Sequence, residues 1–71
     1  MQTYRTILLN TLHNESTDQD LKAVSPRAAA DAALTAAKGE GSFSDALVIE
    51  LHDGVLGARE YWFTVKADGT I

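Results

Sequence analysis

The chain has 71 residues, which is enough for one small domain, and we place that domain at residues 1–71. Ten Asp and Glu against six Lys and Arg give a net charge of −4, which argues against a general nucleic-acid binder with a basic surface. Cysteine is absent and no apolar run reaches the ~18 residues of a membrane span, so the sequence predicts no disulfide, no thiolate metal site and no membrane contact. We therefore expect a cytoplasmic protein.

The N-terminal third predicts two strands joined by a loop. Residues 4–12 contain β-branched and aromatic side chains and no Gly or Pro, which indicates a strand. Apolar residues fall on both of its faces, so we expect an interior strand with Ile7 or Leu8 in the core. Residues 13–20 are predicted as a polar loop. Residues 21–24 are predicted as a short edge strand returning beside the first, where brevity and Lys22 discourage aggregation.

A helix is predicted over residues 27–38, which include seven alanines. Ser25 is suited to cap its first turn, and Pro26 suits the first helical position, where no amide hydrogen is needed. Gly39 can take the left-handed conformation that ends a helix. The stripe expected to face the core consists of Ala30, Ala33, Leu34 and Ala37.

Two more strands are predicted over residues 45–52 and 60–67, separated by an Asp53-Gly54 turn and by Gly57, which indicates a bulge or a longer hairpin loop. Their alternation is expected to point one set of residues into the core: Leu47, Ile49, Leu51, Tyr61, Phe63 and Val65. The other set is expected to face outward: Val48, Glu50, His52, Trp62, Thr64 and Lys66. The order of elements is ββαββ. It predicts an α+β fold with one Ala-rich helix packed on a three- to four-stranded antiparallel sheet.

Signals for chemistry are weak along the whole chain. His13 and His52 fall in different elements without the spacing of a metal pair, so we interpret each as a solvated histidine. No nucleophile-elbow motif and no glycine-rich phosphate loop are present. The sequence therefore predicts no catalytic residue, no cofactor and no metal.

Protein binding fits the pattern better. Trp62 is expected on the sheet face opposite the helix, and Trp is enriched among interface anchors. A second interpretation packs Trp62 under a loop or the C-terminal tail. The expected contact surface consists of Trp62, Val48, Glu50, His52 and Lys66. The sequence leaves its occupant open between a second copy and a foreign protein. A nucleic-acid platform is the less favoured alternative, because acidic residues stand beside Trp62.

This order of elements resembles that of the small anti-CRISPR proteins of phages and mobile elements. The resemblance covers residues 22–25 leading into the Ala-rich helix, residues 47–51 and residues 61–66. It implies stoichiometric inhibition of a CRISPR effector complex, in which the bound protein blocks nucleic-acid binding without catalysis. Acidic residues would then fill a basic groove by charge complementarity: Asp18, Asp20, Asp31, Glu50, Asp53 and Glu60. Ordinary solubilising charges explain the same residues. The alternative function is a homodimeric structural or regulatory protein of a phage or mobile element.

Overall fold

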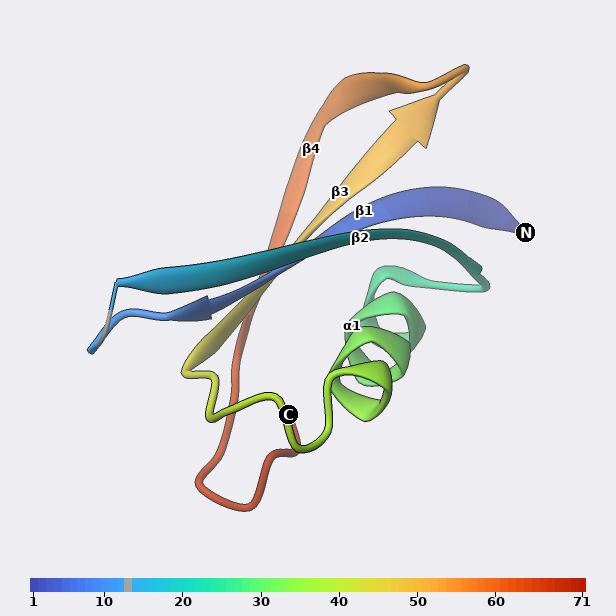
Figure 1. The fold of residues 1–71 in the computed structure, drawn as a ribbon. Coiled ribbons are helices and arrows are strands. Elements are labelled where there is room, and N and C mark those ends of the chain that lie inside the picture. Colours follow the sequence, from blue (N-terminus) through green and yellow to red (C-terminus); the bar gives the residue numbers. More distant parts are fainter. Residues whose placement is uncertain (13) are drawn as a thin grey trace.

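A computed structural model describes residues 1–12 and 14–71 of the chain. Its elements are β1 (Gln2–Asn10), β2 (Glu15–Ala23), α1 (Pro26–Ala36), β3 (Asp45–His52) and β4 (Val55–Thr64). The four strands form one antiparallel sheet in the order β2-β1-β3-β4, and α1 lies across one face of it (Figure 1). The predicted α+β fold and its ββαββ order are confirmed. His13, interpreted above as a solvated histidine, lies outside the described residues.

β1 is an interior strand, as its apolar side chains on both faces predict. It pairs with β2 along one edge and with β3 along the other. Tyr4, Thr6 and Leu8 are buried beneath the helix, so Leu8 rather than Ile7 is the core residue of this strand. The buried Thr6 hydroxyl donates to the Gln19 carbonyl oxygen over 2.8 Å, which satisfies this buried polar group.

β2 is longer than the sequence predicts. The expected loop over residues 13–20 is wrong from Glu15 onward, because every residue from Glu15 to Ala23 pairs with β1. The segment is polar and mostly solvent-exposed, so it lacks the apolar alternation that marks a half-buried strand. Its extended conformation comes from backbone pairing at the edge of the sheet. The position of this strand, at the edge beside β1, is confirmed.

α1 begins where the sequence predicts. The Ser25 side chain accepts a hydrogen bond from the Ala28 amide over 3.1 Å, and Pro26 follows as the first helical residue. The helix ends at Ala36, two residues before the predicted end, and Gly39 adopts a φ of 93° in the turn that follows. The helix buries a row of small side chains against the sheet: Ala29, Ala30, Ala33 and Ala37. These alanines allow the helix axis to lie close to the strands.

The core between α1 and the sheet takes its β3 contribution from Ala46 and Val48, both with no exposed surface. Val48 does not face outward, so that prediction is wrong. The predicted burial of Ile49 and Leu51 is confirmed, but together with Leu47 they lie on the face away from the helix, so the predicted face of this row is wrong. Apolar residues occupy both faces of β3, so alternation alone does not identify the covered one.

β4 runs over Val55–Thr64 instead of the predicted residues 60–67, but its inward-facing residues match the prediction. Tyr61 lies opposite Val48 and Phe63 opposite Ala46, so both side chains share the helix-covered face with them. Both are partly buried and pack against the core, and Val65 is buried just beyond the strand. The predicted inward position of these three residues is confirmed. Between Leu51 and Ile49 the register of β3 against β4 shifts, which places the expected bulge next to Gly57.

Candidate functional site

The face of the sheet that points away from α1, hereafter the open face, is apolar across its middle. Directly paired residues of an antiparallel sheet project to the same side. Ile7 of β1 pairs with Leu47 of β3, and Leu47 pairs with Trp62 of β4. Neighbouring positions of the two middle strands add more aliphatic side chains. We call the resulting group the open-face cluster: Ile7, Leu9, Leu47, Ile49, Leu51 and Trp62.

Trp62 is the most exposed member of this cluster. Its exposed fraction is 59%, which leaves about 150 Å² of a large aromatic side chain in contact with water. Leu56, which pairs with Leu51 near the tip of the β3–β4 hairpin, is exposed at 48%. Ile49 and Leu51 are by contrast buried within the sheet surface itself. The exposed apolar surface of the open face therefore centres on Trp62 and Leu56, and exposed apolar side chains beside one another are typical of interaction sites.

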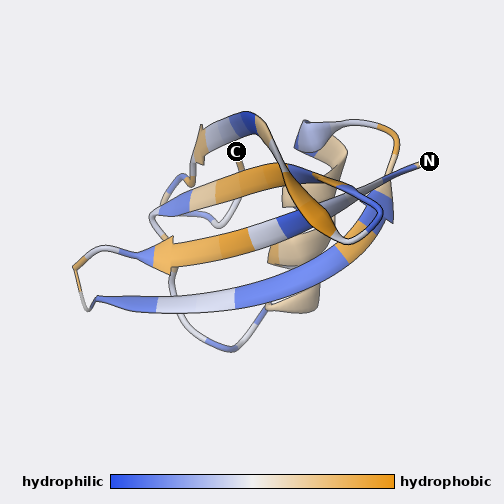
Figure 2. Cartoon of the chain, turned by 90° about the horizontal axis from the view of Figure 1, so that it is seen from above, coloured by the Kyte–Doolittle hydropathy of each residue, from blue (hydrophilic) through white to orange (hydrophobic). Residues whose placement is uncertain are grey.

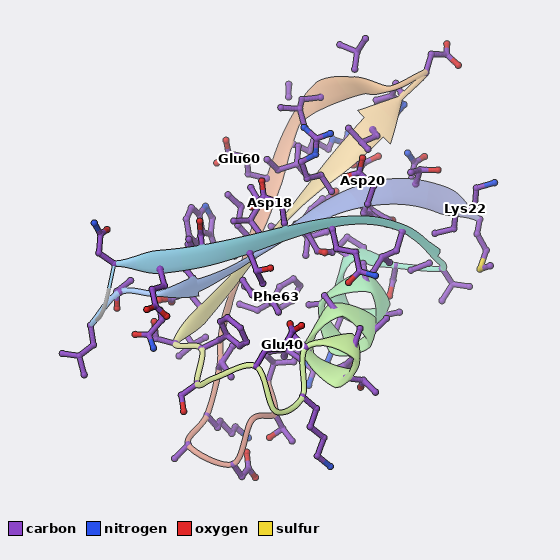
Figure 3. All side chains as sticks on the ribbon, in the orientation of Figure 1. Asp18, Asp20, Lys22, Glu40, Glu60 and Phe63 are labelled. Atoms are coloured by element: carbon purple, nitrogen blue, oxygen red, sulfur yellow. The ribbon has the colours of Figure 1, made fainter. Side chains whose placement is uncertain are left out.

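Charged residues border the open-face cluster along both edge strands. On β2, Asp18 pairs with Ile7 and Asp20 with Arg5, whereas on β4 Glu60 pairs with Ile49. Figure 2 shows the contrast between the apolar middle strands and the hydrophilic β2. In Figure 3, Asp20 and Glu60 lie on the side of the sheet away from α1, whereas Phe63 lies on the helix side. The open face thus has an apolar centre and a polar rim, the anatomy of a protein interface.

One ion pair crosses this rim. Arg5 donates from Nε to Asp20 Oδ1 over 2.9 Å and from Nη2 to Asp20 Oδ2 over 3.2 Å. These hydrogen bonds hold the pKa of the Asp20 carboxyl below its ordinary value. Because both groups are solvent-exposed, the pair orients the two side chains more than it stabilises the fold.

The five predicted contact residues do not form one surface. Trp62 lies on the open face, as predicted, but Val48 is in the core. Glu50 and His52 alternate with Leu51 and so belong to the side of β3 that Val48 occupies. Lys66 is exposed beyond the end of β4. Of the predicted set, only Trp62 belongs to the open-face cluster. The open-face cluster also contains Leu47, Ile49 and Leu51. Their alternation is visible in the sequence, but we assigned these residues to the helix-covered face of the sheet.

A small polar cluster lies on the helix side of the sheet, around Glu50. Its Oε2 accepts a hydrogen bond from the Tyr61 hydroxyl over 2.9 Å, and its Oε1 lies 3.8 Å from His52 Nε2. Burial, reinforced by the nearby Glu50 charge, raises the pKa of Tyr4 above its ordinary value. Among residues 1–12 and 14–71, no group of three or more His, Cys, Asp or Glu side chains could hold a metal ion.

Two depressions flank α1. One of about 290 Å³ lies between β2 and the C-terminal end of the helix and is bordered by Thr17, Gln19 and Glu40. The other, of about 830 Å³, lies between the helix and the C-terminal residues and is bordered by Leu34, Phe43 and other residues. Neither depression brings together side chains whose geometry supports a reaction.

In the part of the chain that the structure describes, no helix has the length and apolarity needed to cross a membrane. The chain matches no family model, no curated protein and no solved structure.

Proposed function

We propose that this protein is a non-catalytic binding module that associates with a protein chain through the open face of its sheet. The observation that carries the proposal is that the sheet has apolar residues on both faces but a helix over only one of them. α1 covers one face of the sheet, yet apolar side chains occupy both faces of β1 and β3. A sheet with one solvated face ordinarily alternates apolar and polar residues.

The composition of the open face supports association with protein. An exposed Trp beside aliphatic side chains can supply an anchor that is fully desolvated on contact, and such residues dominate binding energy. The charged border along β2 and β4 would supply orientation and specificity. These features provide a physical basis for association with a protein, and such binding requires no reactive group.

Affinity capture tests the proposal with matched variants of the full chain. Immobilised wild-type protein should retain partner chains, which include a second copy, that both Trp62→Ala and Leu47→Ser lose. The control is Lys38→Ala, a change at an exposed position just beyond α1, on the helix side of the sheet, which should retain the same chains. Equal retention by all four proteins would assign binding to a different surface and overturn the proposal.

A narrower form of the proposal names the function that the architectural resemblance implies, namely inhibition of a CRISPR effector in the host cytoplasm. Its support is the order of the elements and the net charge of −4, which suits a basic nucleic-acid groove. Purified effector, guide and target should lose target binding as this protein is added, with a break at a fixed molar ratio. Unchanged target binding at a large molar excess would contradict this form for the effector tested.

A further inference from the structure

The central row of residues across the open face is complementary to itself. This row runs from Asp18 on β2 through Ile7 and Leu47 to Trp62 on β4. One end of this row carries a carboxylate acceptor, the middle is aliphatic, and the other end carries an indole N–H donor. A row of this kind matches its own reversed copy.

From this juxtaposition we infer that the occupant of the open face is a second copy of the same chain, bound face to face about a twofold axis parallel to the strands. The inference rests on the proposed function, since it names the partner of the same surface. The axis lays β1 of one copy over β3 of the other, and β2 over β4. Ile7 then meets Leu47, and the Trp62 indole reaches the border that holds the other copy's Asp18. The contact is isologous, as in most homodimers.

The neighbouring row runs from Asp20 on β2 through Arg5 and Ile49 to Glu60 on β4. The twofold axis therefore brings the Arg5–Asp20 ion pair of one copy to Glu60 of the other. Asp20 is already held by Arg5 within its own chain. The two sheets would pack about 10 Å apart, at the angle of about 30° usual for aligned sandwiches.

The size of the face is sufficient for a dimer. Four strands about 4.8 Å apart, each about eight residues long, outline about 500 Å² per copy. Two copies therefore bury about 1,000 Å², the lower limit of a specific interface. The chain exposes 4647 Å², whereas a folded monomer of 7.6 kDa is expected to expose about 4,300 Å².

Sedimentation equilibrium of the full chain tests the inference over a concentration range from about 1 µM to about 500 µM. Wild-type protein should pass from monomer to dimer mass, and Trp62→Ala should raise the dissociation constant at least about tenfold. Asp18→Ala removes the carboxylate acceptor from an exposed edge position and should weaken the dimer while leaving the fold intact. The matched control is Leu12→Ala, which removes an 85% exposed aliphatic side chain beyond the end of β1 and should leave the dissociation constant unchanged.

Each remaining outcome decides between the two proposals. Monomer mass at every concentration overturns the dimer, while capture of a foreign chain that depends on Trp62 still upholds the proposed function. Dimer mass that survives both Trp62→Ala and Asp18→Ala places self-association on another surface and overturns the inference. Circular dichroism of each variant establishes that it is folded. If Trp62→Ala unfolds, Asp18→Ala alone decides, and an unchanged dissociation constant in it overturns the inference.

Discussion

At the scale of single residues, side-chain size decides which face of β3 meets the helix. Ala46 and Val48 are small enough to lie beneath an alanine-rich helix, whereas the larger Leu47 and Ile49 lie on the open face. Close approach of the helix axis to the sheet depends on small side chains on both layers. The two faces of β3 therefore differ more in the size of the side chains that they accommodate than in hydrophobicity.

Substitutions of adjacent residues test this division. Val48→Ala should destabilise the protein by about 2–3 kcal/mol, because it leaves a cavity in a fully covered part of the core. Leu47→Ala should cost about 1 kcal/mol in the monomer, since its side chain is only partly buried. Urea unfolding of both variants at low protein concentration measures the difference. A larger loss for Leu47→Ala would reverse the assignment of the two faces.

The buried Tyr4 hydroxyl predicts a loss of stability in alkali. Its pKa is raised in the folded protein from the ordinary value of 10.0, by burial first and by the Glu50 charge second. Below pH 10 the phenol is protonated in both folded and unfolded chains, so its contribution to stability is fully present. Above pH 10 the unfolded chain releases the proton first, and stability falls as the pH rises toward the folded pKa.

Tyr4→Phe removes this titration. Between about pH 9 and pH 11, the urea midpoint of the wild type should fall more steeply than that of the variant. Both proteins keep the other ionisable groups, so the difference between the two slopes isolates Tyr4. Parallel slopes would show that the Tyr4 hydroxyl titrates alike in folded and unfolded chains.

At the scale of elements, predictability from sequence followed the strength of local signals. The start of α1 was predictable because the Ser25 side chain can cap a helix and Pro26 favours its first position. The first half of β2 was not, because residues 15–20 are polar and gain their extended conformation from pairing with β1. A strand whose extended conformation depends on pairing with a neighbour shows little strand pattern in its own sequence.

The cap of α1 gives a prediction at this scale. Ser25→Ala should destabilise the protein by about 1 kcal/mol, because the Ala28 amide loses its side-chain acceptor at the start of the helix. Ser42→Ala is the control, since Ser42 is an exposed loop residue. Thermal unfolding followed by circular dichroism should separate the two variants. Equal melting temperatures would mean that the cap contributes nothing measurable to stability.

At the scale of the whole molecule, the protein is a two-layer structure with one sheet face left open (Figure 1). Trp62 was predictable as a member of this face, because its position in β4 alternates with the core residues Tyr61 and Phe63. The rest of the open-face cluster was not, because its membership depends on which side of β3 the helix covers. That choice is made by packing across residues far apart in sequence.

Association through the open face predicts a stability that depends on concentration. Where the dimer dominates, each tenfold increase in protein concentration should add about 1.4 kcal/mol per mole of dimer, or about 3–6 °C in melting temperature. Trp62→Ala should melt at a temperature that changes little over the same range. Differential scanning calorimetry at several concentrations makes the comparison. A wild-type melting temperature independent of concentration would contradict this expectation.

The strand order β2-β1-β3-β4 also sets the course of folding. β1–β2 and β3–β4 are hairpins between neighbours in the chain, and isolated hairpins form in about 1–10 µs. Joining them requires β1 to meet β3, where partners such as Ile7 and Leu47 are 40 residues apart. The loop entropy of that meeting must be overcome before the pairing stabilises anything. We therefore expect the meeting of the two hairpins to limit the rate of folding, and α1 lies on the connection that this meeting closes.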